Sequence, residues 1–206
     1  DPIPELRQSA AAIGIPMVSI DADGVVRRTR ILTPDLPSFA FQVLARYLAN
    51  GDSSPKPADL VQIDRTELLQ EILIDYLGPP RTIKTVSYYQ ALDYETLLPP
   101  GIFEGKIVLV GRSVKAIPEP HLLVGDTFLT PFSWIVQGPT AGVEIQANII
   151  SNLLENRFID ELSPRAKLLL LFSLVLPSSL LLARLKPLTG LLATLLLAVA
   201  FLGLAW

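Results

Sequence analysis

Two stretches rich in β-forming residues, VSIDA and VVRRTR, stand on either side of Asp23-Gly24 near the start of the chain. This pattern predicts a β-hairpin with a two-residue type I′ turn, in which Gly24 supplies the positive φ. The letters DADG also resemble the start of a calcium loop. Such a loop needs an oxygen ligand, a glycine and a glutamate where this chain has Val25, Val26 and Leu32, so we predict a turn and no metal site.

Apolar residues recur with helical spacing in two segments. In the first, Ser38 is a suitable N-cap for a helix that runs to Asn50. The second, Thr140–Leu154, is the longest predicted helix of the globular part. Its predicted apolar stripe consists of Val143, Ala147, Ile150 and Leu154, and a polar face carries Glu144, Asn148, Ser151 and Glu155.

Two apolar runs are predicted to be buried strands. EILIDY starts at Glu71, and KIVLVG starts at Lys106 and is bounded by glycine on both sides. The segment TVSYYQAL between them is compatible with a short strand or the start of a helix. We therefore expect an α/β fold with a mixed, mainly parallel sheet, these two strands at its centre, the hairpin at an edge and helices on its faces.

The end of the chain is far more apolar than the rest. Leu168–Ala183 and Leu188–Trp206 contain no charged residue, and ARLKP connects them. Buried core helices are the alternative, but two adjacent runs without a polar face favour a membrane helical hairpin. We thus expect a globular domain over residues 1–162, followed by membrane-spanning helices over residues 163–206. Because the chain starts at Asp1, we expect it to be part of a longer protein.

Composition excludes several classes of function. The 206 residues include 17 basic and 20 acidic ones, a single histidine and no cysteine. Disulfides, thiolate catalysis and multi-histidine zinc sites are thereby excluded. A mildly acidic domain is a poor candidate for nucleic-acid binding. We find no nucleophile with a base and no recognisable carboxylate pair, so we expect neither an enzyme nor a cofactor in this part of the protein.

Three motifs occur in a familiar order: the hairpin IDADGVVRR, the strand KIVLVG with the downstream GDTFLTP, and the helix AGVEIQANII followed by the apolar end. Together they resemble the second type of CHASE domain, the cyclase- and histidine-kinase-associated sensory extracellular domain of bacterial transmembrane receptors. The family's helix motif usually reads GVEIHAN, and Gln146 stands in place of that histidine. If the histidine senses pH or binds a ligand in relatives, this chain lacks that function.

Six residues are candidate ligand contacts: Arg28, Arg30, Asp126, Thr130, Glu144 and Asn148. The two arginines share one face of the hairpin strand and suit an anion, although surface salt bridges are an alternative role. Glu144 and Asn148 are neighbours on one helix face, which is otherwise a solvated face or one with internal hydrogen bonds. The other two lie in GDTFLTP, where a turn-stabilising aspartate is the alternative.

The resemblance implies an extracytoplasmic sensory domain that passes an unknown small-molecule or physical stimulus through membrane helices to a cytoplasmic output domain, a cyclase or a kinase. Receptors of this architecture also imply a homodimer. Two other functions stay open from the sequence: a membrane-anchored structural or dimerisation module without a small ligand, and a membrane-anchored enzyme.

Overall fold

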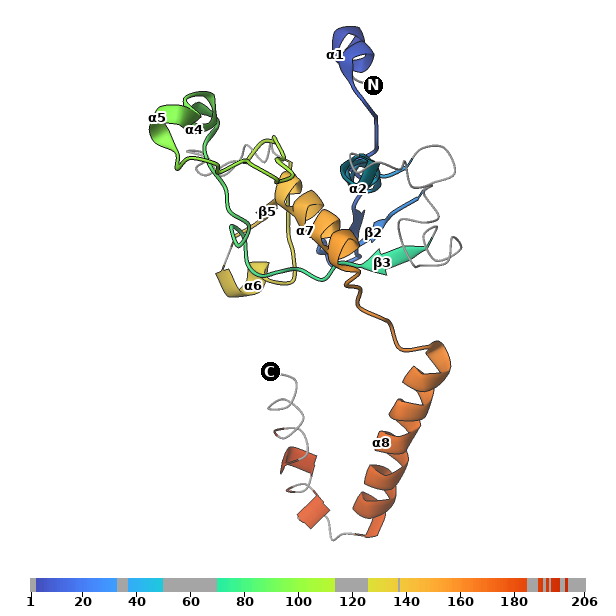
Figure 1. Ribbon diagram of the computed structural model, residues 1–206. Helices are drawn as coiled ribbons and strands as arrows, with labels where there is room; N and C mark the ends of the chain where they lie inside the picture. Colours follow the sequence, from blue (N-terminus) through green and yellow to red (C-terminus); the bar gives the residue numbers. More distant parts are fainter. Residues whose placement is uncertain are drawn as a thin grey trace. The chain divides into compact units, whose positions relative to one another are not determined.

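The computed structural model describes residues 3–32, 37–49, 70–113, 126–136 and 138–184, together with seven positions between 189 and 199. The chain forms two compact units, Asp1–Ile159 and Asp160–Trp206 (Figure 1). The first unit contains the strands and all helices up to α7. The second contains α8. The two are described separately.

The predicted hairpin is confirmed. Strand β1, Ser19–Ile20, pairs antiparallel with β2, Val26–Arg30. Its turn differs from the prediction, because Gly24 has a φ of 82° and neither of the two residues before it has a positive φ. A type I′ turn needs two positive φ values. The loop closes with hydrogen bonds from Gly24 N–H to Asp21 O and from Asp21 N–H to Val25 O, of 2.9 and 3.0 Å.

The expectation of a mainly parallel sheet is wrong. The first sheet has the order β1-β2-β3, and β3, Glu71–Leu73, is antiparallel to β2. This register places Arg30 opposite Glu71, with 3.3 Å between Nη2 and Oε1, so opposite charges favour the antiparallel pairing. A second sheet pairs β4, Thr127–Phe128, with β5, Thr140–Ala141, and is also antiparallel. The fold is therefore mixed α/β with small antiparallel sheets.

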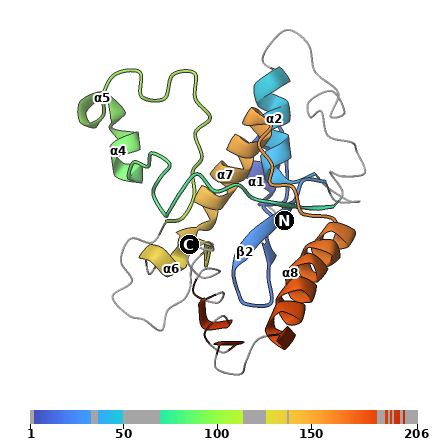
Figure 2. The same cartoon turned by 90° about the horizontal axis from the view of Figure 1, so that it is seen from below.

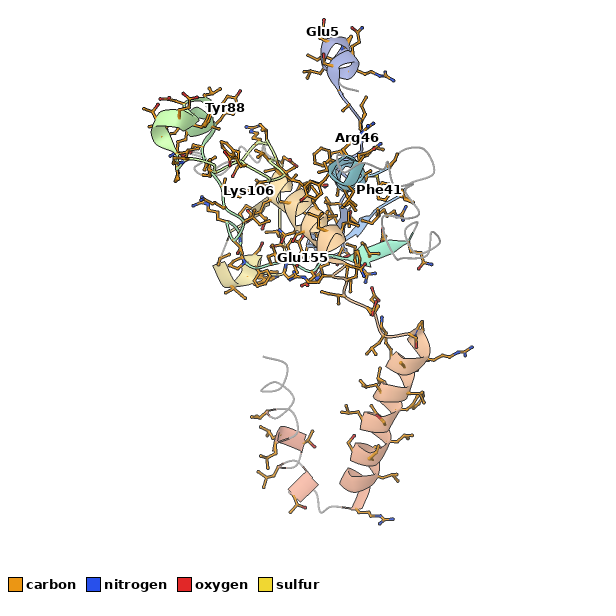
Figure 3. The ribbon with its side chains drawn as sticks, in the orientation of Figure 1. Glu5, Phe41, Arg46, Tyr88, Lys106 and Glu155 are labelled. Atoms are coloured by element: carbon orange, nitrogen blue, oxygen red, sulfur yellow. The ribbon has the colours of Figure 1, made fainter. Side chains whose placement is uncertain are left out.

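Helix α2, Phe39–Ala49, is confirmed, and Ser38 caps it by accepting a hydrogen bond of 3.2 Å from Phe41 N–H. It packs against α7, Gly142–Glu155, and the two helices lie next to each other (Figure 2). Side chains crowd the space between them, with Phe41 on the α2 side (Figure 3). Fully or almost fully buried members of this core are Val26, Ile31, Ala40, Phe41, Leu44, Ile74, Ile145, Ile149, Ile150 and Leu153.

The predicted position of α7 is confirmed, but its predicted apolar stripe is only partly correct. The stripe included Leu154, which is 41% exposed, whereas Ile145 and Ile149 are buried. Asn148 and Asn152 are buried as well. The helix is covered over more than one face, so a single apolar stripe with helical spacing does not describe its buried surface.

KIVLVG is not the central, doubly buried strand that its composition predicts. No strand is assigned to residues 106–111, and exposure alternates along the segment. Ile107 and Leu109 pack against the core, whereas Val108 and Val110 are exposed. An apolar run without alternation in its letters can thus bury only every second side chain.

Short helices complete the first unit. Of the two alternatives predicted for TVSYYQAL, a strand or the start of a helix, the structure has the helix. Ser87 N–H donates a hydrogen bond of 3.0 Å to the Gln90 side chain at the start of α4. The short helices are α1, Pro4–Ser9; α4, Tyr88–Leu92; α5, Tyr94–Leu97; and α6, Ser133–Val136.

The second unit begins with α8, Pro164–Arg184, which contains Pro177. Its leucines from Leu168 to Leu180 are exposed, and the side chains drawn on this helix project outward (Figure 3). None of the helices in the described part of the chain has the length and apolar character of a membrane span. The prediction of membrane-spanning helices is thus not supported by the described helices, and most of Leu188–Trp206 lies outside the described residues.

Candidate functional site

Two adjoining hollows lie at the start of α7. Their volumes are about 140 and 340 Å³. Both are lined by Arg81, Ser113, Ala141 and Glu144. The smaller adds Thr85 and Val143, and the larger adds Pro80, Thr127, Val136, Gly138 and Pro139. We call these two together the α7 hollow.

One basic and one acidic residue, Arg81 and Glu144, line the α7 hollow. Glu144 Oε1 accepts a hydrogen bond of 2.6 Å from the backbone N–H of Arg81, whose φ is 72°. The Arg81 guanidinium forms no salt bridge with any residue in the described part of the chain. The residues that line the α7 hollow thus include one basic, one acidic and one hydroxyl residue: Arg81, Glu144 and Ser113.

Asp126 closes the first turn of α7 from outside. Its backbone carbonyl accepts a hydrogen bond of 2.7 Å from Gly142 N–H. Its carboxylate lies so close to Gly142 that a Cβ atom at position 142 would collide with it. A negative charge beside a helix N-terminus is stabilising. Asp126 thus has a role inside the fold, next to the α7 hollow but not in its lining.

Thr130 is buried and makes hydrogen bonds within the fold. Its Oγ1 lies 3.1 Å from Thr140 Oγ1, and its backbone N–H donates to Ser133 Oγ over 2.9 Å. These contacts tie the loop after β4 to β5. With 1% exposure, Thr130 has no surface to offer a ligand in this conformation.

Asn148 and Asn152 hold an extended piece of chain on α7. Asn152 accepts a hydrogen bond of 3.0 Å from Asp75 N–H and donates one of 2.9 Å to Asp75 O. Asn148 accepts a hydrogen bond of 2.9 Å from Leu77 N–H. The two side chains therefore satisfy the backbone groups that a neighbouring strand would otherwise satisfy.

Glu144, Asn148 and Asn152 form a row with a spacing of four residues, so they lie one above another on the helix. Each accepts a backbone N–H from the segment Asp75–Arg81. We call these three residues the α7 row. It connects the wall of the α7 hollow, at Arg81, with the end of β3.

The C-terminal end of α7 is joined to the same strand. Asn156 ends the helix in the left-handed conformation, with a φ of 49°, and Arg157 N–H donates to Asn152 O over 2.9 Å. Arg157 Nε lies 3.1 Å from Asp75 Oδ2, an ion pair in which Nε makes no hydrogen bond. Ile159 forms an isolated antiparallel bridge with Leu73. The chain therefore leaves the first unit from a point fixed to β3.

Arg28 and Arg30 lie in the hairpin sheet and not in the α7 hollow. Arg28 Nε is 3.8 Å from Asp21 Oδ1, and Arg30 pairs with Glu71. The neighbouring Arg27 donates hydrogen bonds of 2.7 Å to Asp21 and of 2.9 and 2.7 Å to Asp23.

Arg27 also perturbs the acid of the turn. Its guanidinium, together with Val25 N–H, lowers the pKa of the Asp23 carboxyl from 3.8 to about 2. The two carboxylates in turn raise the pKa of Arg27. This cluster fixes the hairpin turn by charge.

Sequence reasoning found part of this arrangement. It identified Glu144 and Asn148 but missed Asn152, although the spacing of four continues to it. It also missed Arg81, whose only local signal is its place after Gly78-Pro79-Pro80. Asp126 and Thr130 lie on either side of β4, and Glu144 lies in the first turn of α7, directly after β5. Arg28 and Arg30 belong to the other sheet.

Gln146, which stands in place of the histidine of the GVEIHAN motif, is buried, with 5% exposure. It does not line the α7 hollow.

The comparisons with known proteins give one match. The family model of the CHASE2 domain matches residues 2–183. No curated protein and no solved structure matches the chain. CHASE2 domains are extracellular sensory domains of signalling receptors. Since the match covers most of the sequence, including the hairpin, the KIVLVG segment and α7, the chain belongs to the CHASE2 domain family.

Proposed function

We propose that residues 1–162 are the extracytoplasmic input domain of a bacterial receptor and that the α7 hollow receives its stimulus. The family is the basis for the sensory role. The observation that carries the site is the α7 row, because the side chain that lines the α7 hollow, Glu144, belongs to the same row as the side chains that hold Asp75 and Leu77.

In this proposal, a ligand that pulls on Glu144 or Arg81 changes the first contact of the row. The segment Asp75–Arg81 and α7 then shift relative to each other, and the shift reaches Arg157 through its ion pair with Asp75 and Ile159 through its bridge with Leu73. A ligand biases such a shift only by the difference in its affinity for the two arrangements. Residues 163–206 would serve as the membrane anchor, and a cyclase or kinase beyond them as the output.

The charges of the α7 hollow suggest the first probes. Arg81 matches an anionic group and Glu144 a cationic one, so free amino acids carry both complementary charges on a small molecule. Binding is measured by calorimetry on the purified chain in a mild detergent. Glu144→Gln keeps an acceptor for Arg81 N–H but removes the charge, so it should weaken binding at least tenfold while the fold is retained.

Glu5→Gln is the matched control, because Glu5 is an exposed glutamate on α1 (Figure 3). It should leave binding unchanged. If no amino acid binds, or if both variants bind like the original protein, the α7 hollow is not the stimulus site. That result would favour the alternative function, a dimerisation module without a small ligand.

A further inference from the structure

The turn at the wall of the α7 hollow places an arginine where glycine is favoured. Thr82 N–H donates to Pro79 O over 3.1 Å, so residues 79–82 form a β-turn with Arg81 at its third position. Arg81 has a φ of 72°, whereas the ring of Pro80, at the second position, restricts that residue to a negative φ. A negative φ followed by a positive one defines a type II turn, whose third position favours glycine or asparagine. We call residues 79–82 the Arg81 turn.

A hydrogen bond to α7 holds the Arg81 turn in this form. The left-handed conformation costs free energy for a residue that has a Cβ atom. Against this cost, Arg81 N–H donates to Glu144 Oε1 over 2.6 Å, and hydrogen bonds to carboxylates are among the stronger ones in proteins. One such bond exceeds the cost of one left-handed residue by only a small margin. The form of the Arg81 turn therefore depends on Glu144.

The alternative form is a type I turn. Both types keep the hydrogen bond between the fourth and first residues, and they differ by a rotation of the central peptide group through about half a turn. In the Arg81 turn that peptide joins Pro80 to Arg81, and a proline at the second position is compatible with both types. The rotation gives Arg81 a negative φ and turns its N–H away from Glu144. Loss of the Glu144 contact thus favours type I, which most residues adopt without strain.

We propose that the Arg81 turn is a two-state switch: type II while Glu144 accepts the Arg81 N–H, and type I when the carboxylate is drawn to another group. Arg81 and Glu144 both line the α7 hollow, so a cationic group bound there competes with the Arg81 N–H for the carboxylate. A ligand response requires two arrangements of the protein, and the two forms of the turn supply them. As the response of a receptor, the switch rests on the proposed function, whereas the two forms of the turn do not.

Nuclear Overhauser effects distinguish the two forms, because the Pro80 Hα lies close to the Arg81 amide proton in type II and farther from it in type I. The full chain is studied in detergent without ligand. The original protein should show a strong effect, and so should Glu144→Gln, which keeps an acceptor for the N–H. Glu144→Ala removes the acceptor and should weaken the effect about fivefold or more. An effect as strong in Glu144→Ala as in Glu144→Gln would overturn the switch.

Glycine at position 81 gives an independent readout, because glycine adopts a positive φ without strain and keeps the turn in type II. In the original protein, Glu144→Ala loses a hydrogen bond but relieves the left-handed strain by the change to type I. In Arg81→Gly, it loses the bond without that relief. Glu144→Ala should therefore lower the urea unfolding midpoint more in Arg81→Gly than in the original protein. Arg81→Ala, which lacks the guanidinium but keeps a Cβ, is the matched control and should behave like the original; an equal loss in all three would contradict the switch.

These two tests use no ligand, so their failure is distinguishable from failure of the proposed function, which calorimetry with free amino acids tests. A third measurement joins the two. Saturation with an amino acid that binds should weaken the Overhauser effect between Pro80 and Arg81 in the original protein, as Glu144→Ala does. Binding with an unchanged effect would keep the α7 hollow as a binding site but would overturn the role of the Arg81 turn in its response.

Discussion

Replacing Asn152 by alanine tests whether the α7 row holds the extended segment onto the helix. Asn152 is 2% exposed and makes two hydrogen bonds to the backbone of Asp75, of 3.0 and 2.9 Å. The variant removes both and leaves an N–H and a C=O of Asp75 without their partner. Each loss of this kind costs about 1 kcal/mol, and more where water does not reach the orphaned group.

Asp75 is only partly buried, so water will satisfy some of this loss. We expect Asn152→Ala to lower the free energy of unfolding by about 2–3 kcal/mol. With a denaturant slope of about 2 kcal/mol per molar urea, the unfolding midpoint should fall by about 1–1.5 M. Urea unfolding of the full chain in detergent, followed by tryptophan fluorescence and by circular dichroism, measures this shift.

The matched control is Ser151→Ala, on the neighbouring position of the same helix. Ser151 Oγ donates to Glu155 Oε1 over 3.1 Å at an exposed site, so its loss should cost less than about 0.5 kcal/mol. An Asn152→Ala midpoint indistinguishable from that of Ser151→Ala would refute the reasoning. The row would then be a set of exchangeable surface contacts.

Three further predictions concern the hairpin and the ends of α7. Because the pKa of Asp23 falls from 3.8 to about 2, its contribution to stability is complete above pH 3.8 and is lost as the pH falls through 2; carbon NMR titration should show this value rise in Arg27→Gln, and an unchanged value would contradict the pairing. Gly142→Ala brings a Cβ against the Asp126 carboxylate and should lower stability by about 1–3 kcal/mol. Adding Asp126→Ala should recover part of that loss in thermal unfolding, and no recovery would mean that the strain lies elsewhere. Gln146→His places an imidazole at a buried position, where burial lowers its pKa below about 6.5. The stability of that variant should be retained above that pH and lost as the pH falls through the lowered pKa, whereas a pH profile as flat as that of the original protein would contradict burial of the new side chain.

Elements with a complete local signal were predictable from the sequence. The hairpin has Asp23-Gly24 between β-forming stretches, and α2 has Ser38 as its cap. The sheet was not predictable, because the antiparallel pairing of β2 with β3 depends on residues some forty positions apart. KIVLVG misled for a physical reason: its letters are uniformly apolar, but its two faces are not equally covered, which only the packing of Ile107 and Leu109 reveals.

The candidate site shows the same division. The sequence predicts that Glu144 and Asn148 share a helix face, because they are four residues apart. Their hydrogen-bond partners, Arg81 and Leu77, are 63 and 71 residues away in the chain and cannot be predicted from this spacing. The residues around an asparagine in the sequence do not indicate whether its side chain will bind a distant backbone group or a ligand. Fold-internal hydrogen bonding was one of the alternatives to ligand binding that the sequence left open for this helix face, and the contacts of Asn148 are of this kind.

The most direct test of the proposed function is the location of the first unit relative to the membrane. A phosphatase that is active only outside the cytoplasm, or a reporter that fluoresces only inside it, is fused after Leu162 in the full-length receptor. Our account predicts phosphatase activity without fluorescence. Fluorescence without phosphatase activity would contradict it, because a domain in the cytoplasm cannot report an external stimulus inward.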